Sequence, residues 1–303
     1  MKKALLAYNP MSGNRFVSKH LDSIIEKFQS LGVILEVYRI PMDDTELKKI
    51  ITDDYSFIIG AGGDGTLGQV VQIMLANKVD IPLFALGAGT CNNFTRNIDV
   101  SKSLNSESQV NQIIEDVYNG KICKIDVGLV NNENIFLTSL AGGAFTDTSF
   151  STDKNLKLMM GPLAYYLKPF TELSSIRAYA IEAIVDGKKY SENVYMFLLI
   201  NGKSVGNFSN FVDTANISDG IMELILIKES STKDIANLFF SVMKGEDITR
   251  HSNVMLLKGN EFLISADEGM KVSIDGEKGP DMPLFVEVKK EAVKVLVSKN
   301  YTE

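Results

Sequence analysis

The sequence predicts an α/β domain followed by a mostly antiparallel β domain. Strand-like and helix-like segments alternate through the first 120 residues, which is typical of βαβ units and a parallel sheet. Beyond residue 120, strand-like segments follow one another with turn signals between them. The length of 303 residues is enough for two domains of about 150 residues each.

Hydrophobic periodicity predicts the elements of the first half. An apolar strand at residues 3–8 opens the chain, and apolar residues at helical spacing from Phe16 to Leu31 predict a helix that stops at Gly32. The other predicted strands cover residues 33–40, 55–60 and 81–86, and the other predicted helices cover residues 43–51 and 66–77.

Strands dominate the predicted second half. Asp186-Gly187 and Asp219-Gly220 are typical turn dipeptides between strands. One helical insertion is expected at about residues 154–173, and a final strand at residues 284–298 could pack on either domain. The predicted strands before it cover residues 123–130, 135–140, 181–185, 194–200 and 221–227.

Composition excludes several classes of protein. The chain has 31 Lys+Arg and 38 Asp+Glu, a net charge of −7, whereas a protein that wraps nucleic acid needs a basic surplus. No apolar run approaches the ~20 residues that span a bilayer, and no leader peptide is expected. Two cysteines favour reduced thiols in a cytoplasmic protein. The two histidines, His20 and His251, are too isolated to build a zinc site or a Ser-His-Asp triad. Chemistry must therefore come from carboxylates, hydroxyls, backbone groups and bound metal.

Three glycine-containing loops follow the first, third and fourth predicted strands. They are residues 9–13, 60–66 and 87–93. The carboxyl ends of the strands in an open α/β sheet line one crevice. Glycine lets backbone N–H groups approach a phosphate, and a helix N-terminus adds partial positive charge. A tight turn explains one such loop, but three in succession favour a phosphate-bearing ligand.

The second loop narrows the choice of ligand. Residues 60–65 match the dinucleotide pattern G-x-G-x-x-G, but they follow the third strand and contain Asp64, which would repel a bare pyrophosphate. A magnesium ion between Asp64 and the phosphates turns this repulsion into attraction. The Walker A pattern is absent. We therefore predict a metal-assisted site for a nucleoside triphosphate.

These motifs resemble those of the bacterial diacylglycerol kinase family of lipid kinases, which are relatives of sphingosine kinases and, more distantly, of NAD kinases. The GGDGT element alone is shared with NAD kinases, whereas the full series of motifs is more specific. The series covers nearly the whole chain in the expected order: Asn9–Gly13, Gly62–Thr66, Gly89–Asn92, Lys124–Gly128, Gly161–Tyr166, Asn201-Gly202, Ser218–Gly220 and Ile274–Glu277.

The resemblance implies a kinase with its active site in a cleft between two domains. It implies transfer of the γ-phosphoryl group of ATP, with Mg²⁺, to a lipid hydroxyl, which gives phosphatidic acid from diacylglycerol. We expect residues 1–124, completed by residues 285–303, to form the nucleotide-binding domain and residues 125–284 to form the lipid-substrate domain. The implied nucleotide site consists of Asn9, Pro10, Ser12, Gly13, Gly62, Gly63, Asp64, Gly65, Thr66, Gly89, Thr90 and Asn92.

Carboxylates take the implied catalytic roles. Asp64 is the candidate that organises magnesium and phosphates, although capping of the helix that begins near Thr66 also explains it. By resemblance, Glu277 is the general base toward the lipid hydroxyl, and Asp126 belongs to the water and metal network that activates this base. Asp126 lies in an apolar strand, where a carboxylate is costly unless it is paired or bound to metal.

Asp219 has two interpretations. The resemblance implies a structural magnesium ion bound by its carboxylate and by nearby carbonyl groups, for which Ile217 and either Ile221 or Met222 are candidates. A type I′ turn at Asp219-Gly220 explains the same residue without a metal ion.

Some positions depart from the family pattern, among them Asn14, which stands where a basic residue often follows Ser-Gly. Asn93 replaces a common aspartate, and Gly68-Gln69 replaces a common Asn-Glu pair, so two carboxylates are missing near the phosphates. Two alternatives to a lipid kinase therefore stay open. One is a kinase of the NAD kinase type with a soluble substrate, and the other is a weakly catalytic protein that binds nucleotide or lipid.

The implied lipid substrate lies at a membrane surface. Residues 154–170 combine Lys154, Lys157 and Lys168 with many apolar side chains, which suits contact with an anionic bilayer. A core-packed helix with one solvated face explains the segment equally well. We expect a cytoplasmic, peripherally membrane-associated protein, and a homodimer is compatible with the sequence.

Overall fold

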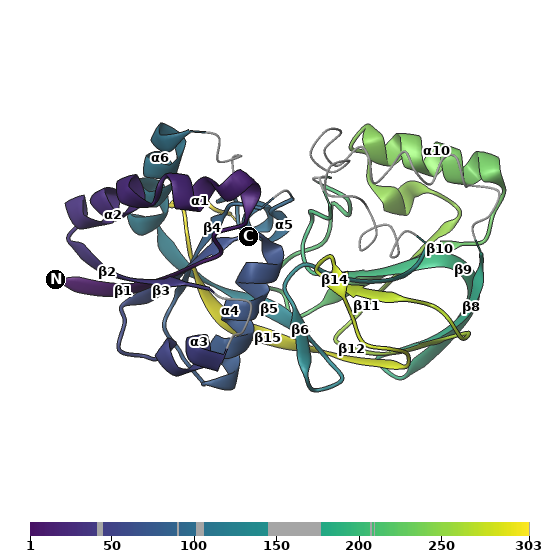
Figure 1. The fold of residues 1–303 in the computed structure, drawn as a ribbon. Helices are drawn as coiled ribbons and strands as arrows, with labels where there is room; N and C mark the ends of the chain where they lie inside the picture. The colour runs from purple at the N-terminus through teal and green to yellow at the C-terminus, as the bar shows by residue number, and fades with distance from the viewer. Residues whose placement is uncertain are drawn as a thin grey trace. The chain divides into compact units, whose positions relative to one another are not determined.

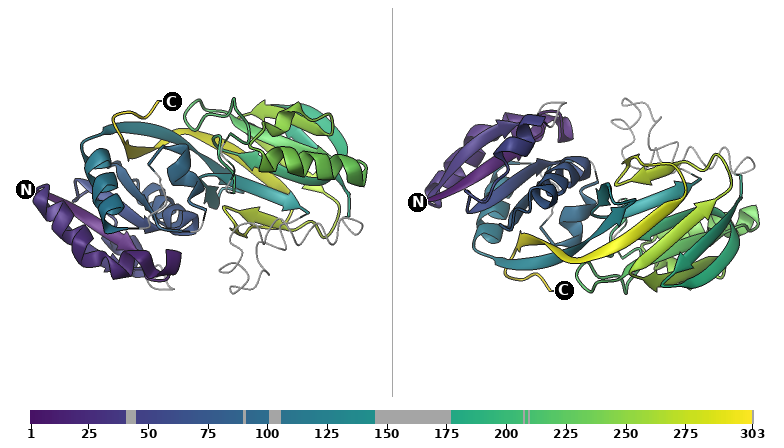
Figure 2. Two further views of the ribbon diagram at one scale, coloured as in Figure 1. Left: turned by 90° about the horizontal axis from the view of Figure 1, so that it is seen from above. Right: turned by 90° about the horizontal axis from the view of Figure 1, so that it is seen from below.

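The computed structural model describes residues 1–40, 45–89, 91–100, 106–144, 177–206, 208 and 210–302. The chain forms two compact units, Met1–Ile125 with Glu291–Glu303 and Asp126–Lys290 (Figures 1 and 2). The predicted insertion at residues 154–173 and the basic, apolar segment at residues 154–170 lie outside the described residues.

A parallel sheet forms the centre of the first unit. Its strands are β1 (Lys2–Tyr8), β2 (Val33–Arg39), β3 (Phe57–Gly62) and β4 (Leu83–Gly87). They lie in the order β2–β1–β3–β4, and β3 and β4 are buried along their whole length, as expected of parallel strands covered on both faces. Because the order reverses between β1 and β3, the loops after these strands border the topological switch point of the sheet.

Helices cover both faces of this sheet. Figure 1 shows α2 and α6 on one side of it and α3 and α4 on the other. The predicted helix from Phe16 to Leu31 is divided because His20 has φ −113° and ψ 16°, outside the helical region. No prediction covers α5 or α6, although Ser106 caps α6 by accepting the N–H of Gln109. The helices are η1 (Gly13–Arg15), α1 (Phe16–Lys19), α2 (Leu21–Ser30), α3 (Thr45–Ile50), α4 (Asp64–Ala76), α5 (Asn93–Asn97) and α6 (Glu107–Tyr118).

Two long strands each have residues in both units. These are β5 (Lys121–Val130) and β15 (Leu284–Val297), which pair with each other. In the first unit, Val295 of β15 pairs in parallel with Leu83 of β4. In the C-terminal segment, one unit ends at residue 290 and the other resumes at residue 291. The first four residues of β15 pair with β12 in the second unit.

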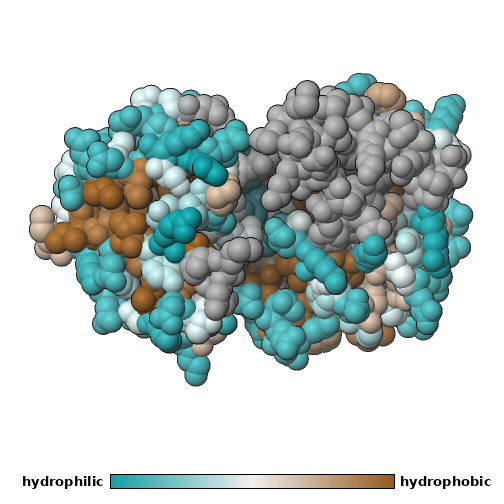
Figure 3. Space-filling view, in the orientation of Figure 1, coloured by the Kyte–Doolittle hydropathy of each residue, from teal (hydrophilic) through white to brown (hydrophobic). Residues whose placement is uncertain are grey.

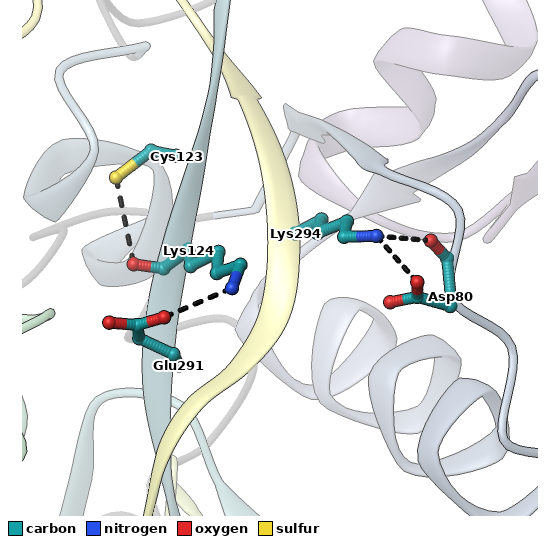
Figure 4. A network of polar contacts seen from close by, with 5 residues as sticks. All are labelled: Asp80, Cys123, Lys124, Glu291 and Lys294. Atoms are coloured by element: carbon teal, nitrogen blue, oxygen red, sulfur yellow. Dashed lines mark hydrogen bonds and ion pairs between the residues drawn. The ribbon is translucent and has the colours of Figure 1, made fainter.

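Ion pairs lie along the part of β15 that belongs to the first unit (Figure 4). Lys124 Nζ of β5 is 3.1 Å from a carboxylate oxygen of Glu291. Lys294 Nζ pairs with the carboxylate of Asp80 and also donates to the carbonyl oxygen of Asp80 at 3.1 Å. All four side chains are at least partly exposed, so each pair contributes about 1 kcal/mol or less. The strand is therefore held mainly by its backbone pairing and its buried apolar side chains.

An antiparallel sheet forms the second unit. Its central strand β9 pairs with β7, β8 and β10, and each of these pairs is antiparallel. The parallel first half and antiparallel second half confirm the predicted fold class. The strands are β6 (Asn134–Phe136), β7 (Ser139–Gly143), β8 (Tyr179–Val185), β9 (Lys188–Ile200), β10 (Met222–Lys228), β11 (Val254–Gly259), β12 (Glu261–Ala266), β13 (Val272–Ile274) and β14 (Glu277–Lys278).

Alternate residues of β9 belong to two cores, as the two-residue period of a strand requires. Phe197 and Leu199 pack in one core with residues of β8, β12 and β15. Leu198 and Ile200 pack in the other core, where Leu238 of α10 (Thr232–Met243) covers the sheet. No prediction covers α10 or η3 (Ile248–Arg250). Ser231 nevertheless signals the start of α10, because its side chain accepts the N–H of the residue three positions on.

The predicted strand at residues 135–140 is interrupted. It is divided into β6 and β7, and the break falls at Leu137 and Thr138. The N–H groups of these two residues donate to the carboxylate of Asp275 rather than to a neighbouring strand. A side chain from a distant part of the chain therefore replaces the strand ladder here.

Apolar surface surrounds the edge strand of the first unit. The strand order ends at β2, and Figure 3 shows hydrophobic residues in brown on this part of the unit. Ile34 and Val37 of β2 are 50% and 39% exposed. Within the described ranges, none of the helices has the length and apolar character needed to cross a membrane.

Gly142 and Phe197 form a cross-strand pair that tests the packing of the second unit. They are directly opposite in β7 and β9, and a Cβ on Gly142 would lie 2.2 Å from a ring carbon of Phe197. We expect Gly142→Ala to lower the free energy of unfolding by about 1–3 kcal/mol through overpacking. Phe197→Leu should relieve this clash, so the loss in the double variant should be smaller than the sum of the single losses. Urea unfolding of the four proteins measures this coupling, and strictly additive losses would contradict it.

Candidate active site

The three glycine loops meet at the carboxyl ends of β1, β3 and β4. The N–H of Asn9 donates to the carbonyl oxygen of Ala61 at 2.9 Å, and the N–H of Ala88 donates to that of Gly62 at 2.7 Å. The side-chain amide of Asn9 also donates to Thr66 Oγ1 at 3.3 Å. These contacts join the first loop to the second and the second to the third.

Close packing between the loops requires glycine at particular positions. A Cβ on Gly13, where φ is +50°, would lie 1.7 Å from the carbonyl oxygen of Ala88. A Cβ on Gly89 would lie 2.6 Å from the Cα of Gly63, and one on Gly62 would meet the Thr66 side chain at 2.6 Å. The glycines therefore have a structural role in holding the loops together, whether or not a phosphate approaches them.

Asp64 connects the second loop to the third. α4 begins at Asp64 with Gly63 as its N-cap, so capping of its own helix near Thr66 is the wrong interpretation of this aspartate. Its two carboxylate oxygens accept the backbone N–H groups of Asn93 at 3.1 Å and Phe94 at 3.0 Å. Asp64 thus supplies acceptors to the first residues of α5, where N–H groups lack partners within the helix.

The third loop is closed by Asn92 and leaves one buried acceptor at Asn93. Asn92 has φ 53°, and its side chain accepts the N–H of Gly89 at 2.6 Å while donating to the Gly89 carbonyl oxygen at 3.0 Å. The buried Oδ1 of Asn93 has no hydrogen-bond partner among the described residues. An unsatisfied buried acceptor costs about 1–3 kcal/mol, so this position fits a ligand that brings a donor, such as water on a cation. Thr90 lies outside the described residues.

The other predicted nucleotide contacts lie along the same edge. Asn9 Oδ1 accepts the N–H of Met11 at 2.9 Å and so closes an Asx turn. Pro10 and Ser12 are half-buried in the first loop, and Gly65 is exposed in the first turn of α4. The structure thus brings together the described members of the predicted nucleotide set.

In the second unit, Asp126 is paired with a turn. Its side chain in β5 is fully buried, and Oδ2 accepts the N–H of Gly220 at 2.6 Å. The N–H of Asp126 donates to the carbonyl oxygen of Ile217 at 2.8 Å. The predicted need for a partner is therefore met by the backbone of the turn that contains Asp219.

The turn at Asp219 is not of type I′. That turn requires positive φ at both central residues, and of this pair only Gly220 has it, at 83°. Asp219 Oδ1 accepts the N–H of Ile221 at 2.9 Å, and Met222 begins β10 opposite Gly259. No group of three or more His, Cys, Asp or Glu side chains suited to a metal ion occurs among the residues described. A cation here would need backbone carbonyl and water ligands.

Glu223 is a buried carboxylate that the motifs do not single out. It is fully buried in β10, and Lys258 Nζ lies 3.0 Å from its Oε1. Lys258 also donates to Thr214 Oγ1 at 2.9 Å. Burial raises the pKa of the Glu223 carboxyl, the Lys258 ammonium group opposes this rise, and Asp219 adds to it. A lone glutamate within an apolar strand was the signal for this residue, as it was for Asp126.

Asp275 anchors the turn that carries Glu277. Its Oδ2 accepts the N–H of Leu137 at 2.8 Å, and its Oδ1 accepts the N–H groups of Thr138 and Ser139, both at 2.9 Å. Thr138 Oγ1 donates to the same Oδ1 at 2.6 Å. Burial raises the pKa of the Asp275 carboxyl, and these donors oppose the rise because they stabilise its ionised form. Glu277, two residues further on, is exposed.

Comparison with known proteins decides the family. The family described as "Diacylglycerol kinase catalytic domain" matches residues 3–130, and the "YegS C-terminal NAD kinase beta sandwich-like domain" matches residues 146–297. A diacylglycerol kinase of Staphylococcus aureus (strain JH9) is 30% identical over 286 residues, which are 93% of this chain and 88% of the relative. The chain belongs to the diacylglycerol kinase family. A diacylglycerol kinase of Bacillus subtilis (strain 168) is 29% identical over 93% of this chain and 92% of its own.

Solved structures support the fold of this family member. A crystal structure described as a diacylglycerol kinase from Bacillus anthracis superposes with a TM-score of 0.75 at 17% identity, covering 99% of this chain and 98% of the other. A second structure from that organism has a TM-score of 0.83 at 19% identity, over 99% and 97% of the two chains. The matches confirm the predicted family, the fold class and an enzyme of the kinase class, while the roles of single residues stay predictions.

Gly13 tests the contact between the first and third loops. We expect Gly13→Ala to lower the free energy of unfolding by about 1–3 kcal/mol more than Gly32→Ala does. Gly32 is a matched control because it also has positive φ, at +74°, but no atom lies within 4 Å of its added Cβ. Chemical denaturation compares the two variants. Equal losses would mean that backbone strain, and not packing against Ala88, explains the glycine.

Proposed function

We propose that this kinase transfers the γ-phosphoryl group of ATP, with Mg²⁺, to the hydroxyl group of diacylglycerol or a related lipid, giving phosphatidic acid from diacylglycerol. The observation that carries the proposal is the meeting of three glycine loops at the switch point of the parallel sheet, with Asp64 connecting two of them. Relatives that match nearly the full chain and are named diacylglycerol kinase support the lipid class of substrate.

The nucleotide is proposed to bind at the glycine loops through backbone N–H groups. Residues 1–124 carry 13 basic and 14 acidic side chains, so this part of the chain has no basic surplus to balance a triphosphate. Magnesium supplies that neutralisation in phosphoryl transfer. Asp64 and the buried Oδ1 of Asn93 are oxygen groups suited to the water shell of the ion, since magnesium keeps several of its waters.

The second unit is proposed to supply the groups that act on the lipid. Glu277 accepts the proton of the lipid hydroxyl as general base, and its exposure suits contact with a substrate. Asp126 supports this base through a water and metal network. Asp219, with the carbonyl groups of Ile217 and Met222, is the proposed site of a structural magnesium ion. The Ile217 carbonyl already accepts one hydrogen bond and has a second lone pair for a metal.

The cellular setting is part of the same proposal. A lipid substrate requires peripheral contact with a membrane from the cytoplasm, and a homodimer is compatible with this function. The net charge of −7 opposes attachment to an anionic bilayer, so such contact has to be local. Nucleic acid is not proposed as a partner for the same electrostatic reason.

Two observations favour specific alternatives. Asn93 and Gln69 occupy positions where the family commonly has carboxylates, which favours weak catalysis or nucleotide binding alone. The matched description of residues 146–297 also names a sandwich of the NAD kinase type, which favours a soluble substrate. The two alternatives predict different results in the assay that follows.

A kinase assay with radiolabelled ATP tests the proposal. The wild-type protein with dioleoylglycerol in detergent micelles should give a labelled lipid, and chelation of magnesium by EDTA should abolish it. Asp64→Asn and Glu277→Gln should each lower kcat by about 100-fold or more, because phosphoryl transfer depends on charge neutralisation and positioning. Asn93→Asp should raise the rate if the missing carboxylate limits catalysis.

Matched controls separate chemistry from folding in this assay. Asp247 is an aspartate whose two carboxylate oxygens accept the N–H groups of Thr249 and Asp213, so Asp247→Asn removes a charge and one acceptor oxygen, as Asp64→Asn does. Glu261→Gln neutralises another exposed glutamate of the second unit. Both controls should keep wild-type kcat. A parallel reaction with NAD in place of the lipid completes the assay: labelled NADP there without labelled lipid would favour the NAD kinase alternative, and ATP binding without turnover of either acceptor would favour the binding protein.

A further inference from the structure

The turn before Glu277 is fixed by a side chain that lies two residues away from it. β13 and β14 are joined by Asp275 and Gly276, whose φ angles of 47° and 89° are both positive, as in a type I′ hairpin. Ile274 pairs with Glu277 across the turn. The backbone of Glu277 is thereby determined by the conformation of Asp275, whose own N–H donates to the Ser139 carbonyl oxygen at 2.9 Å.

The Asp275 carboxylate is more heavily bonded than a turn requires. It accepts three consecutive backbone N–H groups, from Leu137 to Ser139, and the hydroxyl of Thr138. The hairpin itself needs only the Asp-Gly dipeptide. These four bonds tie the hairpin to the connection between β6 and β7, which is the point where the strand ladder is interrupted.

Asn201 extends this network to Asp126. Its side-chain amide is fully buried and donates to the carbonyl oxygens of Asp126 at 2.8 Å and Leu137 at 3.0 Å. The N–H of Asn201 donates to the carbonyl oxygen of Thr138 at 2.8 Å. A continuous chain of hydrogen bonds therefore runs from Asp126 through Asn201 and residues 137–139 to Asp275, all within the second unit.

We propose that Asp275 is a positioning residue: through the Leu137–Ser139 segment and Asn201, it fixes the place of Glu277 relative to Asp126. The proposal rests on the function proposed above, in which Glu277 accepts the proton of the lipid hydroxyl. Asp275 has both oxygens engaged by the protein and acts only through the hairpin. A misplacement of about 1 Å can lower a catalytic rate by about 100-fold, so the anchor affects the rate even without touching substrate.

Asp275→Asn tests the proposal with a small change in shape. The amide has one acceptor oxygen, so its NH₂ group would face one of the backbone donors that the carboxylate satisfies. We expect kcat for lipid phosphorylation to fall about 10- to 100-fold, with KM for ATP unchanged within about twofold, because the glycine loops belong to the other unit. In a Glu277→Gln background, Asp275→Asn should cause no further loss, since it acts through the side chain already removed.

Asp186→Asn is the matched control. Asp186 and Gly187 form the corresponding two-residue turn between β8 and β9, with φ of 47° and 79°, and Asp186 Oδ1 accepts the N–H groups of Asn260 and Glu261. This variant should lose stability but keep kcat. If Asp275→Asn fails to fold, Thr138→Val removes only the hydroxyl donor and should lower kcat by about 3- to 10-fold.

Two kinetic results would overturn the inference while leaving the proposed function intact. One is an Asp275→Asn enzyme with wild-type kcat, and the other is an equal further loss when Asp275→Asn is added to Glu277→Gln. The function fails separately if the wild-type protein phosphorylates no lipid, and the inferred role then fails with it. Hydrogen exchange gives a readout without catalysis: Asp275→Asn should speed exchange at residues 137–139 and 276–278, and unchanged exchange there would refute the anchor.

Discussion

Hydrogen bonds from main-chain N–H groups to aspartate carboxylates hold the loops that carry the candidate functional residues of each unit. The carboxylate of Asp64 accepts the N–H groups of the first two residues of α5, and that of Asp126 accepts the N–H of Gly220. The carboxylate of Asp275 accepts the N–H groups of Leu137 to Ser139. In each case the donors lie at the start of a helix or strand or in the turn or break beside one, where their N–H groups lack a partner within the element. Loss of such an acceptor leaves a buried donor unsatisfied, which costs about 1–3 kcal/mol. The carboxylates therefore shape the backbone of the site before any ligand binds.

The glycines of these loops have two explanations, close packing of the backbone and room for a phosphate. Gly13 and Gly89 are required by contact with Ala88 and Gly63, so glycine-rich sequence after a strand reports close packing of backbone as well as room for a phosphate. The Oδ1 of Asn93, which has no hydrogen-bond partner among the described residues, is a different kind of observation, because packing alone gives no reason for it. The candidate nucleotide site thus combines closely packed loops with one buried acceptor that none of the described residues satisfies.

Local patterns predicted much of the fold, and contacts between distant residues account for most differences. The parallel strands, the glycine loops and the Asp-Gly turns follow from periodicity and turn chemistry over a few residues. The contact of Asp64 with α5 spans 29 positions, and that of Asp275 with Thr138 spans 137, so no local pattern reveals either partner. The interruption of the predicted strand at residues 135–140 has the same cause. α10 is a different case, since Ser231 and the apolar spacing after it were local signals.

The two strands that belong to both units also impose an order on folding. β4 completes its pairing only with the Glu291–Val297 half of β15, which is synthesised after the whole of the second unit. Until then, the parallel sheet of the first unit has an open edge at β4, in addition to its permanent edge at β2. Open edges attract strands of other chains. The first unit is therefore exposed to misassociation until the second unit has been synthesised, even though its own helices and loops emerge first.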